Sequence, residues 1–191
     1  MIETIKTVLE NTQNRTPMVH SITNNVTIND CANIILAAGG TAIMAQDERE
    51  VEEITSHAQA LVINMGAVRA QEAMLRAAKI ARRNGNPVVL DPVAAGASTL
   101  RREMCSRLLS ENLVSVIRGN ASEVRALAAG AEQETGVEAS ALDSVTEDNL
   151  QESAAWLRSF SRRTGAVVMK RVRNRSQNHL PKDQQGGLQL P

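Results

Sequence analysis

The chain has 191 residues, of which 42% are hydrophobic and 22% charged, and its formal net charge at pH 7 is zero. This length suits one domain with a sizeable core, and the charge balance gives no general attraction to nucleic acid or to an anionic membrane. Aromatic residues make up only 1%, which excludes the stacking platforms that single-stranded nucleic acid requires.

The cysteines and the N-terminus indicate a cellular location. Cys31 and Cys105 lie in predicted helices without metal-ligand spacing, which is typical of reduced, buried thiols. The first ten residues carry two acids and read as an amphipathic helix rather than a signal peptide. No apolar run reaches the length of a transmembrane helix. We therefore predict a cytoplasmic protein that binds neither membrane nor nucleic acid.

Helices and short apolar strands alternate along the chain. In chain order we predict a helix at Ile2–Asn11, an extended segment at Thr16–Asn25, a helix at Val26–Ala38, a strand at Thr41–Ala45, a helix at Asp47–Ala58, a strand at Ala60–Gly66, a helix at Arg69–Asn84, a strand at Pro87–Asp91, a helix at Thr99–Ser110, a strand at Leu113–Ile117, a helix at Asn120–Ala129 closed by Gly130, a loop at Ala131–Thr146, a helix at Glu147–Thr164 and a strand at Ala166–Met169.

The predicted strands are continuous apolar runs, as in strands that are buried on both faces of a parallel sheet. Their alternation with helices predicts right-handed crossovers and an α/β fold, with a mostly parallel open sheet and helices on both faces. Ligands of such sheets bind at the carboxyl ends of the strands. Side chains at these ends are therefore the first candidates for a functional site.

Asp91 directly follows a buried strand, and Pro92 stiffens the exit of the chain. A carboxylate in this place can hold a metal ion. It can equally accept backbone hydrogen bonds in the turn, which is the commoner role of an aspartate there.

A second polar group follows the predicted strand at Leu113–Ile117. Arg118 offers a planar, bidentate partner for phosphate oxygens, and Glu123 falls in the first turn of the next helix. Asn120 and Glu123 can simply cap that helix. They can also stand beside a bound phosphate and its Mg²⁺. Two acidic strand ends with one arginine suggest phosphoryl transfer.

Polar residues also end the first extended segment. Asn25 follows Asn24, and such side chains either shape a turn or bind a heterocycle through hydrogen bonds. His20 is more typical of a structural histidine than of a catalytic one. Met44 ends a strand, where a core methionine is the ordinary interpretation.

Seven segments in this order resemble the hydroxyethylthiazole kinase family of the ribokinase-like superfamily, from about residue 4 to 169. The matching segments are Val19-His-Ser-Ile-Thr-Asn-Asn-Val26, Cys31-Ala-Asn33, Ala37-Ala-Gly-Gly-Thr-Ala-Ile-Met-Ala45, Glu50-Val-Glu-Glu53, Ala60-Leu-Val-Ile-Asn-Met-Gly66, Val89-Leu-Asp-Pro-Val-Ala-Ala-Gly-Ala97 and Ile117-Arg-Gly-Asn-Ala-Ser-Glu123.

The resemblance implies transfer of the ATP γ-phosphate to the hydroxyl of 4-methyl-5-(2-hydroxyethyl)thiazole in thiamine salvage, by a homotrimer with sites at subunit interfaces. It implies that Met44 and Asn25 contact the thiazole and that Arg118 binds ATP phosphate. It further implies that Asp91 and Glu123 organise Mg²⁺. Residues 1–169 would form the ribokinase-like domain.

The C-terminal residues depart from the family pattern. Lys170 and Arg171 stand where the family has a Thr-Gly pair, and its later Gly-Thr/Ala-Gly-Cys segment, which lies beside the attacking hydroxyl, has no match. Residues 170–191 contain five basic residues, one acid and no helical period, which predicts a disordered basic tail. We interpret the departure as a truncation or frameshift after Met169, with a functional basic arm as the less favoured alternative.

Three functions remain open on this basis. The first is a thiazole kinase that is impaired by truncation, with apolar sheet surface left exposed, a tendency to aggregate and little activity. The second is a remnant that binds the thiazole without catalysis. The third is a kinase for a related small alcohol or vitamin, against which the segment from His20 to Asn25 argues.

Overall fold

A parallel six-stranded sheet forms the centre of the molecule in the computed structural model, which describes residues 2–131 and 150–171. The predicted loop at 131–146 and the predicted tail at 170–191 lie outside these residues, apart from 131, 170 and 171. The strands are β1 (Met18–Ile22), β2 (Thr41–Ile43), β3 (Ala60–Asn64), β4 (Val88–Asp91), β5 (Val116–Gly119) and β6 (Val167–Lys170).

Seven α-helices and two 3₁₀ turns are described along with these strands. The helices are α1 (Ile2–Arg15), α2 (Ile28–Ala37), α3 (Val51–His57), α4 (Gln71–Arg83), α5 (Thr99–Ser110), α6 (Ala121–Ala131) and α7 (Leu150–Thr164); the turns are η1 (Val68–Ala70) and η2 (Ala95–Ala97).

The strand order is β2-β1-β3-β4-β5-β6, and each neighbouring pair is parallel. The chain goes from β1 to β2 on one side and then returns to place β3 on the other side of β1. From β4 onwards each new strand adds next to the one before it. The predicted parallel α/β sheet is confirmed, and the order of its strands reverses between β1 and β3, a type of place where ligands of open sheets bind.

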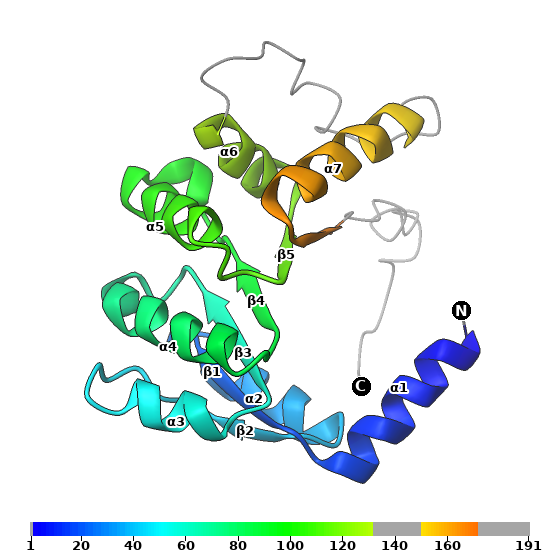
Figure 1. Ribbon diagram of the computed structural model, residues 1–191, viewed down its shortest axis with the longest axis vertical. Coiled ribbons are helices and arrows are strands. Elements are labelled where there is room, and N and C mark those ends of the chain that lie inside the picture. The colour runs from blue at the N-terminus through cyan, green and yellow to red at the C-terminus, as the bar shows by residue number, and fades with distance from the viewer. Residues whose placement is uncertain (1, 132–149, 172–191) are drawn as a thin grey trace, which may run out of the picture.

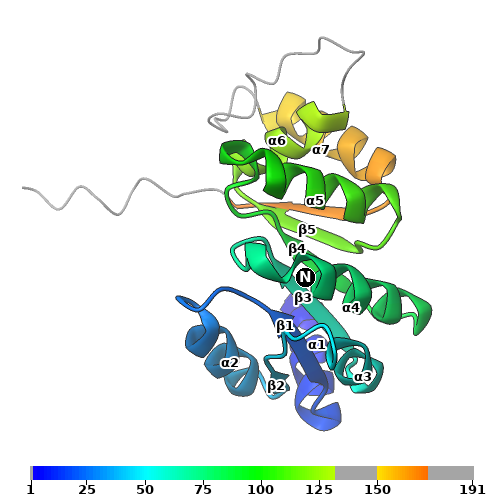
Figure 2. The same cartoon turned by 90° about the vertical axis from the view of Figure 1, so that its left-hand side faces the viewer.

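One face of the sheet is covered by the helices from α3 to α7 (Figure 1). Figure 2 shows α4 and α5 lying over the strands. The strand side chains on this face form the core and are fully buried, among them Leu61, Ile63, Leu90 and Ile117. Alanines of α4 let this helix approach the sheet closely, because Ala73, Ala77, Ala78 and Ala81 are all at 0% exposure.

The opposite face is less covered. There α2 packs against β2 and lies on the other side of the sheet from α3 (Figure 1), which confirms helices on both faces. Further along, Val62, Val89 and Val116 are only half-buried, while Val167 and Met169 of β6 are 60% and 57% exposed. Apolar sheet surface is therefore partly exposed on the strands from β3 to β6, as the sequence leads us to expect.

The helix α1 also lacks buried residues among those described, and it projects from the sheet in Figure 1. Its apolar side chains, Ile2, Ile5, Val8 and Leu9, are between 49% and 84% exposed. The amphipathic pattern was read correctly, but it does not face the core of this chain. No helix in the described ranges is long and apolar enough to cross a membrane.

Several predicted boundaries shift for identifiable reasons. The strand predicted at 113–117 begins only at Val116, because Asn112 adopts a positive φ of 53° and the N–H of Leu113 closes α5 by donating to the carbonyl of Leu108. Gly130, predicted to end a helix, lies inside α6.

The cysteines are both free, as predicted, but only one is in the core. Cys105 is fully buried, and burial raises the pKa of its thiol to about 12. Cys31 is half-buried on α2, so the prediction of two buried thiols is wrong for Cys31.

Candidate functional site

Three of the predicted site residues meet at the carboxyl ends of β4 and β5. Asp91 is the last residue of β4, Arg118 lies within β5, and Glu123 lies in the first turn of α6. The two strands are adjacent and parallel, with Leu90 beside Ile117, so their ends fall at one edge of the sheet. The sequence predicted this grouping from the strand ends alone.

Asp91 and Arg118 form an ion pair, with Arg118 Nη1 3.4 Å from Asp91 Oδ2. The carboxylate side chain is 24% exposed and the guanidinium side chain 47% exposed, so water and ligands can reach both. Burial raises the pKa of Asp91 and the charge of Glu123 adds to this rise, whereas the charges of Arg118 and Arg171 oppose it. The Asp91 carboxylate thus interacts both with a negative charge, that of Glu123, and with the positive charges of Arg118 and Arg171.

Asn120 and Glu123 form a reciprocal cap at the start of α6. The N–H of Glu123 donates to Asn120 Oδ1 at 2.9 Å, and the N–H of Asn120 donates to Glu123 Oε2 at 2.8 Å. This geometry confirms the capping interpretation. It also fixes the carboxylate of Glu123, a residue at 9% exposure, beside the end of β5.

Gly119 lets these elements approach closely. A β-carbon added there would lie 3.3 Å from the Glu123 carboxylate and from the ring of Pro92. The β4 exit and the start of α6 are therefore held side by side at the end of β5. A bulkier residue would separate the two carboxylates of the candidate metal site.

The donor set suits a hard, water-bearing cation. Carboxylate oxygens are the ligands that Mg²⁺ prefers, and Mg²⁺ in phosphate sites usually keeps several waters and takes only one or two carboxylates. Within residues 2–131 and 150–171 no group of three His, Cys, Asp or Glu side chains could hold a metal ion. The pair of Asp91 and Glu123 fits Mg²⁺ held jointly with ligand phosphates and water, and does not fit a metal caged by protein alone.

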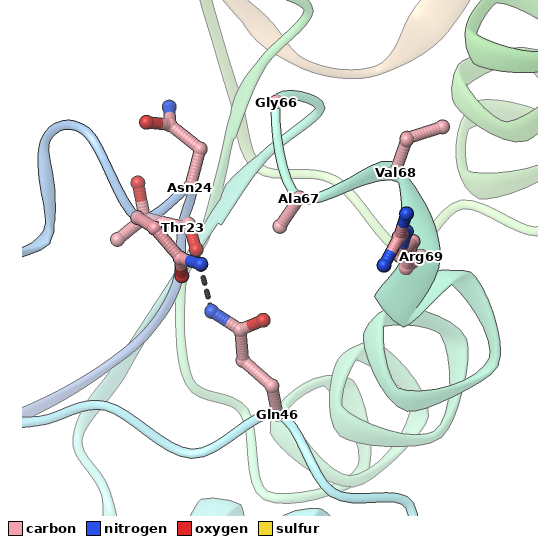
Figure 3. A pocket seen from close by; sticks show the side chains of 8 residues that line it. Thr23, Asn24, Gln46, Gly66, Ala67, Val68 and Arg69 are labelled. Carbon is pink, nitrogen blue, oxygen red and sulfur yellow. Dashed lines mark hydrogen bonds between the residues drawn. The ribbon is translucent and has the colours of Figure 1, made fainter.

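A cleft of about 240 Å³ opens at the same edge, between the ends of β1 and β3 (Figure 3). This is the place where the strand order reverses. The cleft is lined by side chains and backbone of Thr23, Asn24, Asn25, Gln46, Gly66, Ala67, Val68 and Arg69. Its walls are uncharged except for Arg69, and they carry several amides that can donate and accept hydrogen bonds.

Amide side chains bind the walls of the cleft to one another. Asn24 Nδ2 donates to Asn64 Oδ1 at 3.3 Å, and the same oxygen accepts the N–H of Gly66 at 2.7 Å. Gln46 Nε2 donates to the carbonyl of Thr23 at 2.5 Å, as Figure 3 shows. The loops that follow β1, β2 and β3 are thus joined, and the cleft is shaped before any ligand enters.

Gly66 is needed for this arrangement. A β-carbon there would lie 2.6 Å from Asn64 Oδ1 and 2.7 Å from Asn24 Nδ2, closer than real β-carbons approach such atoms. Any side chain would push the two asparagines apart. The backbone from Gly66 to Arg69 could not then keep its place as one wall of the cleft.

Of the two residues predicted to contact the thiazole, only Asn25 lines the cleft. Asn25 is exposed and lines the cleft. Met44 follows β2, is half-buried, and is not among the residues that line the cleft. Its neighbour Ala45 is held in place because His20 Nε2 lies 2.9 Å from the Ala45 carbonyl oxygen.

His20 is structural in its surroundings. It is at 0% exposure, Nδ1 lies 2.8 Å from Thr55 Oγ1, and burial lowers the pKa of the imidazole. A neutral ring with the proton on Nε2 satisfies both contacts, because the carbonyl of Ala45 can only accept. The structural interpretation of His20 made from the sequence agrees with this environment.

The sequence did not predict the bridging role of Asn24, the cleft residues Gln46 and Arg69, or Asn64, which supports the wall of the cleft. Asn64 lies within the predicted strand at Ala60–Gly66, and its partner lies 40 residues away in sequence. A cluster of amides after three successive strands was the one available signal. Its meaning depends on loop conformations that residue spacing does not give.

Comparisons with known proteins point in one direction. The model of the family described as "Hydroxyethylthiazole kinase family" matches residues 9–170. A hydroxyethylthiazole kinase of Clostridium acetobutylicum is 48% identical over 166 residues, which cover 86% of this chain and 61% of the relative. One of Desulfovibrio desulfuricans is 51% identical over 164 residues, covering 85% of this chain and 58% of the relative.

A solved structure is also similar. The hydroxyethylthiazole kinase protein from Pyrococcus horikoshii OT3 superimposes with a TM-score of 0.73 at 33% identity, over 87% of this chain and 59% of that chain. The present chain thus spans about three fifths of the length of these relatives, from 58% to 61%.

Proposed function

The chain belongs to the hydroxyethylthiazole kinase family, and we propose that its site is built to transfer the γ-phosphate of ATP to the hydroxyl of 4-methyl-5-(2-hydroxyethyl)thiazole, with Mg²⁺, as a step of thiamine salvage. In this reaction the hydroxyl oxygen forms a bond to the γ-phosphorus. The bond from that phosphorus to the β–γ bridging oxygen breaks, ADP leaves, and the hydroxyl proton is released. Because the reaction uses ATP, we place it in the cytoplasm.

The thiazole would occupy the cleft between β1 and β3. A neutral heterocycle needs an uncharged pocket with a few polar groups to orient it, and the amides of Asn25 and Gln46 supply such groups. Met44 would contribute from the rim, beside the fixed carbonyl of Ala45. The hydroxyethyl arm would then extend along the sheet edge towards β4.

The phosphates of ATP would lie at the ends of β4 and β5. Arg118 presents a planar fork to phosphate oxygens, and α6 directs the positive end of its dipole towards the same edge. Asp91 and Glu123 would hold Mg²⁺ through carboxylate oxygen or water. When bound, Mg²⁺ neutralises charge on the phosphates, which together with positioning accounts for most catalysis of this kind.

One observation carries the proposal. Asn64 on β3 supports the wall of the cleft. It is paired in register with Asp91 on the adjacent strand β4, and Asp91 is one of the residues proposed to hold the ATP phosphates and Mg²⁺. The two half-sites are therefore neighbours along one sheet edge, as an alcohol and a γ-phosphate must be if they are to react.

A non-catalytic thiazole-binding protein is the second candidate. It is favoured by the cleft itself, whose walls are hydrogen-bonded to one another. Binding there does not require the phosphate-binding residues at the ends of β4 and β5.

A homotrimer, as the family resemblance implies, would cover part of the exposed apolar surface of α1.

Two measurements on the purified 191-residue chain separate these candidates. Calorimetry with the thiazole alone measures binding, and a coupled ADP-release assay with the thiazole, ATP and Mg²⁺ measures transfer; light scattering gives the oligomeric state. The kinase proposal expects turnover that falls at least tenfold in Arg118→Ala, because a charge-assisted phosphate contact is worth about 1.5–3 kcal/mol. Binding without turnover supports the second candidate, and no binding of the thiazole refutes both.

A further inference from the structure

A second arginine stands at the phosphate edge of the sheet. Arg171 directly follows β6, and its backbone N–H donates to the carbonyl oxygen of Gly119 at 2.8 Å. This bond continues the ladder between β5 and β6 by one residue beyond Lys170. The backbone at Arg171 is thereby held against the end of β5, where the Arg118 and Glu123 segments meet.

The alternation of strand side chains places Arg171 on the side of Arg118. Arg118 is paired in register with Met169, and residues two apart along a strand point to the same face. Met169 and Arg171 are two apart. The charge of Arg171 also acts on Asp91, as the charge of Arg118 does. Asp91 therefore has two arginines near it.

The balance of positive and negative side chains at this edge of the sheet decides which ligands it can bind. The edge carries two carboxylates, Asp91 and Glu123, so that with Arg118 alone it would be negatively charged and phosphate would need Mg²⁺ to offset the carboxylates. The second guanidinium, of Arg171, balances the second carboxylate and leaves the edge without net charge. Guanidinium groups also bind phosphate oxygens in bidentate geometry and are weakly hydrated, whereas Mg²⁺ sheds water reluctantly.

We propose that Arg118 and Arg171 together form a clamp for the polyphosphate of a nucleotide, and that this chain captures the polyphosphate without a divalent cation. The inference rests on the proposed function, because it assumes that the phosphates of a nucleotide lie at this edge. It assigns Arg171 as a phosphate-binding residue. Mg²⁺ then matters for the transfer of the phosphoryl group more than for capture of the ligand.

The test is calorimetric binding of ADP and of inorganic pyrophosphate to the full 191-residue chain, once in EDTA and once in MgCl₂. The variants are Arg171→Ala, Arg171→Lys and, as a matched control, Arg162→Ala. Arg162 is an exposed arginine in the last turn of α7, near the start of β6 and thus at the opposite edge of the sheet. Circular dichroism before each titration checks that the variant is folded.

We expect wild-type protein to bind both ligands in EDTA, with an affinity that MgCl₂ changes by less than about threefold. Arg171→Ala should weaken binding in EDTA by about tenfold, the equivalent of one charge-assisted contact at a half-exposed site. Arg171→Lys should keep part of this affinity, because it retains the charge but loses the planar fork. Arg162→Ala should bind as the wild type does.

Two results would overturn the inference. If wild-type protein binds ADP only when MgCl₂ is present, the edge does not hold phosphate without metal, while the proposed kinase site stands. If Arg171→Ala weakens binding no more than Arg162→Ala, Arg171 is not part of the clamp. Absence of nucleotide binding in both buffers would refute the inference and the proposed function together.

Discussion

Replacing His20 with leucine tests how the loop beside the cleft is held. The imidazole joins three segments, since His20 lies on β1, Thr55 on α3 and Ala45 in the loop after β2. Leucine fills much of the same volume but offers no polar atom. The change thus removes both hydrogen bonds with little change in packing.

The expected cost follows from what each partner loses. The carbonyl of Ala45, a residue at 4% exposure, loses the donor provided by His20 Nε2; an unsatisfied buried acceptor costs about 1–3 kcal/mol. The single hydroxyl proton of Thr55, which His20 Nδ1 accepts in the wild type, can turn to the carbonyl of Val51, so this end of the contact adds little to the cost. We expect the free energy of unfolding to fall by about 2 kcal/mol, the middle of the range for the Ala45 carbonyl alone.

Urea denaturation followed by circular dichroism measures this loss. The matched control is His57→Leu, the same substitution at an exposed position on α3, which should stay within about 0.5 kcal/mol of wild type. The thiazole affinity should also fall in His20→Leu, because the Met44–Ala45 segment is released. An unchanged urea midpoint in His20→Leu would show that these hydrogen bonds do not stabilise the fold.

The pH dependence gives an independent check. Burial lowers the pKa of His20 below its ordinary value of 6.5, so between these two values the unfolded chain binds a proton that the folded chain does not. The stability that this histidine contributes is therefore complete above 6.5 and declines as the pH falls below it, by at most about 1.4 kcal/mol per pH unit. His20→Leu should lose this slope, and an identical slope in both proteins would refute the assignment.

Three further changes test other parts of the site and fold. Gly66→Ala should lower thiazole affinity at least tenfold, because its β-carbon would push apart the bridging asparagines, whereas Gly96→Ala, whose nearest contact would be an ordinary 3.4 Å, should bind normally in calorimetry. Asn120→Ala should lower the free energy of unfolding by about 1 kcal/mol through loss of the α6 cap; an unchanged thermal midpoint would contradict this. Met169→Glu should reduce binding of the dye ANS and aggregation with little loss of stability, while Val168→Glu, which buries a charge against the core, should unfold the protein; equal effects would show that the two faces of β6 are not different.

The sequence was sufficient for the sheet because its strands are apolar runs that end in polar residues. Asp91 and Arg118 could be placed together from those ends, since parallel neighbours share an edge. Thr99–Ser110 was predicted with the bounds that the structure gives. These features depend on local pattern and on a topology with few alternatives.

The cleft was harder because its geometry is made by loops. The bridge from Asn24 through Asn64 to Gly66 depends on the register between β1 and β3 and on two turn conformations. Met44 was expected within a strand, but β2 ends one residue earlier. The exposure of α1 was not predicted either, because an amphipathic pattern shows that a helix has an apolar side without showing what covers it.

The order of strands has a consequence for synthesis of the chain. From β4 onwards, each strand pairs with the strand that was made just before it. Every partial product that ends after one of these strands can therefore form a smaller sheet with the same connections. Folding can proceed from the N-terminus while translation continues, and each new strand needs only an edge that already exists. At every stage, however, the last strand made offers unpaired backbone groups to other chains. We therefore expect association between nascent copies to compete most strongly with folding when several ribosomes translate one mRNA close together.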